Sequence, residues 1–137
     1  MRFEEVERIA ARGESVTVEF KETTGELRQA VETICAFLNT QGGQVFLGIA
    51  PSGKLIGQQV SDRTQQEIAN AIRKLEPPLP VDTAYVEVPG TDRYVIVMAV
   101  TPATDMIPFT FEGRAHRDHN PGDAPGTVPT VALAAPT

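Results

Sequence analysis

The sequence predicts an α+β fold in which a mixed sheet packs against two or three helices. Two observations carry this prediction. The apolar residues follow a helical period in some segments and alternate or run together in others. The resulting order is helix, strand, helix, strand, strand, helix, strand, strand. In addition, 41% of the 137 residues are hydrophobic, which is enough for one core.

The chain begins with an expected helix followed by a half-buried strand. Apolar residues recur at helical spacing over about 2–12, and Gly13 suits the C-terminal end of that helix. Residues 15–20 then alternate between polar and apolar. Glu19 and Lys21 fall on the polar positions, so we expect both side chains to face away from the core.

The middle of the chain predicts a helix, a central strand and a short returning strand. The helix covers about 24–39, with Thr23 and Glu26 in the positions of a capping box. Val45–Ile49 is an almost continuous apolar run, typical of a central strand that is buried on both faces. Lys54–Ile56 follows a turn and is expected to return as a hairpin strand.

A third helix is expected after Ser61 or Asp62, and the prolines within 77–80 end it. Further strands are expected at about 81–88, 93–100 and, more weakly, 107–112, where Gly113 ends the last. Residues 120–137 are rich in Pro, Gly and Ala and show no periodicity, so we expect a disordered tail.

Composition restricts the class of protein. A net charge of −6 argues against a general nucleic-acid binder, although a local basic patch can act within an acidic chain. Cys35 is the single cysteine, so an internal disulfide is excluded, and we expect a small buried hydrophobe. No apolar run is long enough to span a membrane, and the charged N-terminus is unlike a signal peptide. We therefore expect a cytoplasmic protein.

Glu14, Glu19 and Lys21 are the first candidates for a functional site. Five positions separate the two glutamates, which places them on opposite faces of an unbroken strand. A bend near Gly13 would let them converge, and converging carboxylates bind a divalent metal or act as an acid–base pair. Otherwise Glu14 lies in solvent. Lys21 is either a phosphate-facing cation or a partner in a surface ion pair.

Gly42 and Gly43 form the second candidate site. Exposed N–H groups in such a turn can hold an anion, but the sequence lacks both common nucleotide-binding fingerprints. The alternative is a helix-to-strand turn that needs glycine for its backbone. Asn39 precedes this turn and is expected to hydrogen-bond it.

The segment after the last expected strand is locally basic. His116, Asp118 and His119 are conceivable metal ligands, and the alternative is a solvated segment. Arg114 and Arg117 are candidates for phosphate contacts.

Several of these motifs together resemble the Schlafen-type AlbA domain family, over about residues 12–117. They read EFK, ICAFLNTQGG, FLGI, SGKLIG, EIANAIRKLEPPLP and IPFTFEGRAHR. The resemblance implies a two-layer α/β sandwich like the Alba fold, occupying residues 1–119 before the tail. It also implies DNA binding, a place in bacterial transcriptional regulators and a homodimer. An older family label implies ATP binding, for which the sequence contains no phosphate loop.

The resemblance also implies a nuclease alternative. Related Schlafen domains cleave structured RNA with three acidic residues and a divalent metal. Glu14 and Glu19 stand at the spacing of the first two acids, but the turn Ala50–Gly53 contains no carboxylate for the third. We therefore expect no catalysis and no cofactor, with Mg or Mn needed only under the nuclease alternative.

The leading hypothesis is a regulatory module that binds DNA or RNA. The residues expected at its surface are Lys21, Gly42, Gly43, Lys54, Arg114 and Arg117. The alternatives are a metal-dependent endoribonuclease that uses Glu14 and Glu19, and a structural or oligomerisation domain.

Overall fold

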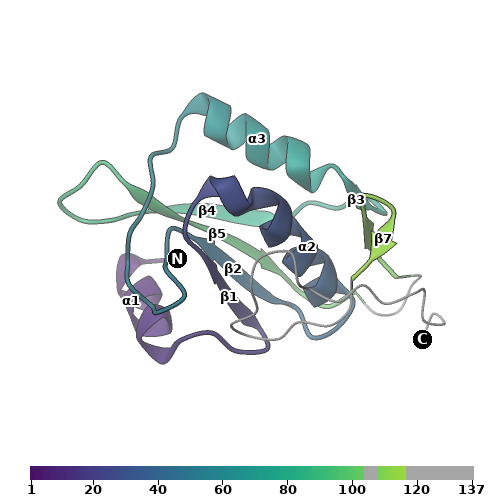
Figure 1. The fold of residues 1–137 in the computed structure, drawn as a ribbon, viewed down its shortest axis with the longest axis horizontal. Helices are drawn as coiled ribbons and strands as arrows, with labels where there is room; N and C mark the ends of the chain where they lie inside the picture. Colours follow the sequence, from purple (N-terminus) through teal and green to yellow (C-terminus); the bar gives the residue numbers. More distant parts are fainter. Residues whose placement is uncertain (104–107, 117–137) are drawn as a thin grey trace.

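The computed structural model describes residues 1–103 and 108–116 (Figure 1). Its main feature is a four-stranded sheet in the order β1-β2-β5-β4. β1 runs parallel to β2, and the other neighbouring strands are antiparallel, so the sheet is mixed as predicted. The strands are β1 (Val18–Lys21), β2 (Gly43–Leu47), β4 (Asp82–Glu87) and β5 (Tyr94–Val100).

Each face of this sheet has its own core. Val45 and Leu47 of β2 pack with α2 (Leu27–Leu38) and α3 (Asp62–Ile72) on the first face. Phe46 packs with α1 (Phe3–Arg12) on the second face. The sheet with α2 and α3 forms the predicted two-layer α+β arrangement, and α1 adds cover on the other side. The prediction that β2 is central and buried on both faces is confirmed.

A second, small sheet has the order β3-β6-β7. Its strands are β3 (Leu75–Glu76), β6 (Thr110–Phe111) and β7 (Arg114–Ala115). β6 and β7 pair as a tight hairpin, and residues 109–116 are called the C-terminal hairpin below. The sequence predicted one weak strand over 107–112. The structure instead has two short strands on either side of the turn at Gly113, and residue 107 lies outside the described residues.

The start of α2 differs from the prediction. Thr24–Glu26 form a 3-10 turn (η1), so the α-helix begins three residues later than expected. Both predicted capping residues act at this turn. The Thr23 hydroxyl accepts a hydrogen bond from the Gly25 amide at 3.0 Å, and a Glu26 carboxylate oxygen accepts one from the Glu22 amide at 3.0 Å.

Two other expectations concern the turns around β2 and α3. The predicted return of Lys54–Ile56 is confirmed in part. The segment runs back antiparallel, with the Ile56 amide donating to the Gly48 carbonyl at 2.9 Å, but it forms an isolated bridge between Ile49 and Leu55 and not a strand. The predicted cap of α3 is confirmed, since the Ser61 hydroxyl accepts a hydrogen bond from the Thr64 amide at 3.2 Å. None of the helices in the described part of the chain is long and apolar enough to cross a membrane.

Candidate functional site

Glu19 and Lys21 form a buried ion pair, with 2.9 Å between Lys21 Nζ and Glu19 Oε2. Each residue is 3% exposed. The prediction that these side chains face away from the core is therefore wrong. The register pairs Glu19 with Val45 and Lys21 with Leu47, which places both side chains on the face that α2 covers. The alternation of polar and apolar residues in β1 separated the two faces of the strand correctly, but α2 covers one face and α1 covers the other.

Glu14 lies beside this pair. The chain bends through the turn between Ser15 and Val18, where the Ser15 amide donates to the Val18 carbonyl at 3.0 Å. The bend lets a Glu14 carboxylate oxygen accept a hydrogen bond from the Phe20 amide at 2.9 Å. Burial raises the pKa of Glu19 to about 7; Lys21 lowers this pKa and the neighbouring Glu14 raises it. The sequence left two arrangements open: Glu14 in solvent, or Glu14 converging with Glu19. The structure shows Glu14 and Glu19 converging.

The residues around this pair do not fit a divalent metal. One Glu14 oxygen holds the Phe20 amide, and one Glu19 oxygen holds the Lys21 ammonium. Mg²⁺ and Mn²⁺ prefer near-octahedral oxygen ligands. Within residues 1–103 and 108–116, no three His, Cys, Asp or Glu side chains are grouped to hold a metal. The nearby turn that follows β2 supplies no carboxylate either.

Gly42 and Gly43 are required by close packing. A Cβ at Gly42 would lie 2.7 Å from the Val100 carbonyl oxygen, and one at Gly43 would lie 2.6 Å from the Thr17 carbonyl oxygen. The Gly42 amide already donates to the Phe37 carbonyl at 2.7 Å, so it is not available to an anion. These contacts favour the helix-to-strand turn over the anion site.

Asn39 holds a different segment from the one expected. Its Nδ2 donates to the carbonyls of Phe109 at 3.0 Å and His116 at 2.7 Å. Its Oδ1 accepts from the Phe109 amide at 2.7 Å. Asn39 is 6% exposed, so these bonds form away from water. One side chain at the end of α2 thus fixes both ends of the C-terminal hairpin.

His116 is buried, which makes the solvated-segment interpretation wrong for this residue. Its Nε2 lies 3.8 Å from a Glu32 carboxylate oxygen. Burial lowers the pKa of His116, and Glu32 acts in the opposite direction. Cys35 is a buried hydrophobe, as predicted, and burial raises its pKa to about 11. The remaining candidates in this segment, Arg117, Asp118 and His119, lie outside the described residues.

Three exposed cations gather around the turn of the C-terminal hairpin, and we call Arg28, Lys74 and Arg114 the basic cluster. Arg28 Nη2 and Lys74 Nζ contact the two carboxylate oxygens of Glu112, at 2.7 and 3.4 Å. Arg114 lies opposite Phe111 in the same hairpin. Sequence reasoning selected Arg114 but missed Arg28 and Lys74, because Arg28 lies in α2 and Lys74 in the turn after α3, and no local motif links them.

The structure does not assemble Lys21 and Lys54 into one surface with this cluster. Lys21 is buried in its ion pair. Lys54 is exposed, but its turn packs against α1, since a Cβ at Gly53 would lie 2.6 Å from the Ala10 carbonyl oxygen. Figure 1 shows α1 and the C-terminal hairpin at opposite ends of the molecule. Arg114 is the predicted residue that remains available within the basic cluster.

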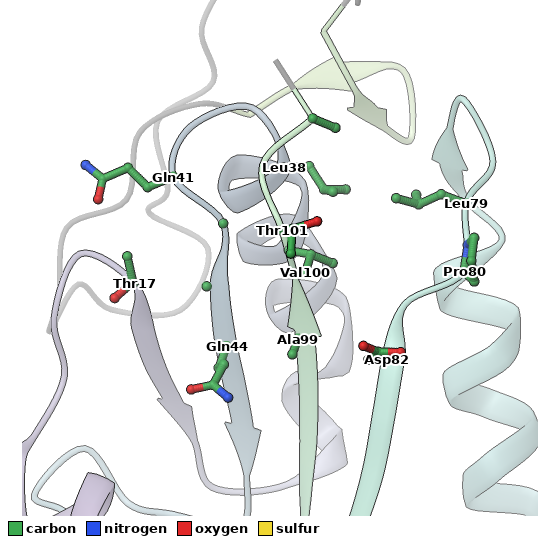
Figure 2. A pocket seen from close by; sticks show the side chains of 13 residues that line it. Thr17, Leu38, Gln41, Gln44, Leu79, Pro80, Asp82, Ala99, Val100 and Thr101 are labelled. Atoms are coloured by element: carbon green, nitrogen blue, oxygen red, sulfur yellow. The ribbon is translucent and has the colours of Figure 1, made fainter. Parts of the chain in front are cut away.

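A cavity of about 530 Å³ opens at the end of the sheet where β2 begins and β5 ends (Figure 2). We call it the end cavity. Gly42 and Gly43 line one side, and Leu79 and Pro80 line another. Its polar lining side chains are Thr17, Gln41, Gln44, Asp82 and Thr101. Apart from the twin-glycine turn, no sequence pattern pointed to this cavity.

Two solved structures share the fold. The N-terminal domain of a protein from Nitrosomonas europaea, named as related to the ATP-dependent DNA helicase RecG, matches with a TM-score of 0.61 and 23% identity. The match covers 87% of this chain and 82% of that domain. The DIP2311 protein from Corynebacterium diphtheriae matches with a TM-score of 0.60 and 20% identity. Here the match covers 90% of this chain but 30% of the other protein.

No curated protein matches the sequence. Residues 14–123 match the family described as Schlafen, AlbA_2, which is most of the chain. The match includes Glu14, the buried pair Glu19 and Lys21, the twin-glycine turn and the C-terminal hairpin. The chain therefore belongs to the Schlafen AlbA_2 family.

Proposed function

We propose that this chain is a nucleic-acid-binding module that does not cut its ligand. The observation that carries the proposal is the basic cluster. Two exposed cations, Arg28 and Lys74, converge on Glu112 at a hairpin turn that also carries Arg114, in a chain whose net charge is −6. Arginine guanidinium groups match the geometry of phosphate oxygens, and lysine adds a mobile point charge.

Glu112 holds two members of the basic cluster in place. It contacts Arg28 and Lys74 together, and these contacts lower the pKa of Glu112. Glu32 also acts on the Arg28 guanidinium, and Glu67 lines the same hollow as Arg28 and Lys74, so the proposal depends on the exposed faces of the cations and not on a net excess of positive charge. The side chains of Arg28 and Lys74 remain 64% and 56% exposed, so a phosphate can reach them. The name of the RecG-related neighbour supports a nucleic-acid ligand but does not separate DNA from RNA.

Salt-dependent binding tests this proposal. Fluorescence anisotropy with labelled DNA and RNA oligonucleotides, at about 50 mM salt and above, should show binding that weakens as salt rises. Replacing Arg28, Lys74 or Arg114 by alanine should weaken binding. It should also reduce the slope of log K against log[salt] by about 0.7–0.9 for each phosphate that the variant no longer neutralises. Arg63→Ala is a matched control, because Arg63 is an exposed α3 cation outside the cluster.

Two results would contradict the proposal. One is the absence of binding to every oligonucleotide at about 50 mM salt, where phosphate contacts are strongest. The other is an equal loss of binding in Arg63→Ala and in the cluster variants, which would indicate a diffuse charge effect. Within the same proposal, the module serves a bacterial regulator as a homodimer, and sedimentation of the free and bound protein tests the dimer.

The convergence of Glu14 and Glu19 favours one second candidate, an endoribonuclease. A carboxyl group whose pKa is about 7 is suited to acid–base catalysis near neutral pH. The burial of Glu19 and the poor fit to a metal weigh against it. Transfer-RNA digestion with added Mg²⁺ or Mn²⁺ tests this candidate. Cleavage that disappears in Glu19→Gln would replace the binding-only proposal, whereas cleavage that survives would come from a contaminant.

A further inference from the structure

The two edges of the four-stranded sheet differ in how their outward-facing backbone groups are satisfied. At the β1 edge, the chain closes the strand itself. The Ser15 amide donates to the Val18 carbonyl at 3.0 Å, and the Val18 amide donates to the Ser15 carbonyl at 3.3 Å. A Glu14 carboxylate oxygen accepts from the Phe20 amide at 2.9 Å. The β1 edge therefore has few free groups to offer a further strand.

The β4 edge is open. The Val88 amide donates to the Arg93 carbonyl at 2.9 Å, so Val88 faces β5, and the alternate residues Thr83, Tyr85 and Glu87 face away from it. The backbone groups of these three residues make no hydrogen bond within the described part of the chain. Their N–H and C=O groups form a row that can pair with one more strand, and we call it the free row.

The free row belongs to a regular and well-packed strand. β4 pairs with β5 over six consecutive residues without a bulge, and it contains no proline and no lysine. Tyr85 packs against the first core and Val86 against the second, which holds β4 in place. Only Val86 is buried among its residues, so the edge remains accessible. Natural edge strands are usually protected by bulges, prolines or lysines, and β4 has none of these.

Two acids at the ends of β4 select the occupant by charge. Residues 81–88 contain Asp82 and Glu87, both exposed, and no cation. A second copy of β4 would bring four carboxylates together without a counter-charge, which disfavours self-pairing. A strand with lysine or arginine opposite each acid would instead form two cross-strand ion pairs. We propose that the β4 edge is a docking site for an extended segment of a partner protein, with basic residues opposite Asp82 and Glu87.

Two hollows near the start of β4 can receive side chains of such a segment. One, of about 310 Å³, is lined by Ala84, Val97 and Ala99 on the face that α1 covers in part. The other, of about 540 Å³, is lined by Ile72 and Leu79, which pack against the core on the opposite face. Side chains of a strand alternate between the two faces of a sheet. Backbone pairing would thus supply affinity, and the hollows would supply specificity.

Hydrogen exchange in the free protein tests the free row itself. The amides of Thr83, Tyr85 and Glu87 should exchange faster than those of Ala84 and Val86, which donate to β5. Equally slow exchange at all five amides would show that the edge is already occupied and would overturn the proposal. Protection that rises with protein concentration would identify a second copy of this chain as the occupant.

A basic peptide tests the docking. The probe is the labelled hexapeptide Lys-Val-Thr-Val-Thr-Lys, which in antiparallel pairing places its lysines opposite Glu87 and Asp82. It should bind in fluorescence anisotropy and slow the exchange of the free-row amides. N-methylation of its two threonines removes donors that face β4 and should weaken binding about 10-fold or more. N-methylation of its two valines, whose amides face away from β4, is the matched control and should leave binding unchanged.

Charge reversal tests the selection. The double variant Asp82→Lys and Glu87→Lys should lose the lysine peptide and bind Glu-Val-Thr-Val-Thr-Glu instead. Both side chains are exposed, and the dispersion of the amide spectrum verifies that the variant folds. Glu22→Lys is the matched control, because Glu22 is an exposed acid beyond the end of β1, and it should keep the preference for the lysine peptide.

Three results would overturn the proposal: no binding of the lysine peptide, equal binding of the threonine-methylated peptide, or unchanged binding in the double variant. The docking site goes beyond the proposed nucleic-acid binding and does not depend on it, because β4 contains no member of the basic cluster. Loss of oligonucleotide binding would therefore leave the docking site standing, and loss of peptide binding would leave the basic cluster standing.

Discussion

Replacing Asn39 by alanine should destabilise the protein by about 3–4 kcal/mol. The substitution removes three buried hydrogen bonds, two to Phe109 and one to His116. Each contributes about 1 kcal/mol net, and a backbone group left buried and unpaired adds about 1 kcal/mol or more. For a chain of 137 residues, this loss lowers Tm by about 10–15 °C. Urea unfolding, followed by circular dichroism, measures it directly.

A local measurement shows where the loss occurs. The Phe109 amide donates to Asn39 Oδ1, so its hydrogen exchange should accelerate more than that of amides in β5. Asn70→Ala is the matched control, because Asn70 is exposed on α3, and it should change stability by no more than about 0.5 kcal/mol. A loss below about 1 kcal/mol in Asn39→Ala, or unchanged exchange at Phe109, would refute the role of Asn39 as the anchor of the C-terminal hairpin.

Two further predictions concern the buried glutamate and the twin-glycine turn. The pKa of Glu19 rises from 4.5 to about 7 on folding, so the folded state binds more protons between these values and stability should fall as pH rises through them, by up to about 3 kcal/mol. Urea unfolding from pH 4.5 to 8 measures how stability changes with pH. Glu19→Gln should flatten this pH dependence and also lower stability overall, because Lys21 loses its carboxylate partner. The exposed Glu22→Gln should keep the pH dependence, and an unchanged pH dependence in Glu19→Gln would contradict the assignment. Gly43→Ala should cost about 2–3 kcal/mol, since its Cβ would press on the Thr17 carbonyl. Gly90→Ala, whose Cβ would meet no atom within 4 Å, should cost about 1 kcal/mol, and equal losses in thermal unfolding would refute the packing argument.

The secondary structure was predictable where one local signal dominates. The apolar run from Val45 to Ile49 allowed only a buried central strand, and the structure places β2 there. Ser61 marked the start of α3 correctly because an N-cap acts within four residues. The 3-10 turn before α2 was missed because Thr23 and Glu26 would have capped either form of helix.

The orientation of Glu19 and Lys21 could not be predicted from alternation alone. Period two separates the faces of a strand, but it does not say what covers each face. Phe20 packs against α1 residues on the second face, which leaves the charged pair beneath α2. The anchor at Asn39 was out of reach for a related reason. Its partner Phe109 is 70 residues away in sequence, and no local pattern marks such a contact.

The buried ion pair changes the basis for expecting binding without cleavage. From the sequence, that expectation depended on a missing third acid. In the structure, Glu19 has a second reason to be inert, because Lys21 supplies its counter-charge in a site closed to solvent. Removing one partner of such a pair leaves an uncompensated buried charge and costs about 3–5 kcal/mol. This free-energy cost of losing one partner explains why Glu19 and Lys21 occur together, whether or not the site performs any chemistry.

The exposed groups that could bind a ligand lie away from the Glu19–Lys21 pair. The basic cluster and the end cavity are built from α2, α3, the C-terminal hairpin and the end of the sheet, and neither includes Glu14 or Glu19. A ligand bound at the cluster would contact its cations without reaching Glu14 or the buried Glu19. The surface that can bind and the acids that could cut are therefore separate in this chain, and variants of one should leave the other unchanged.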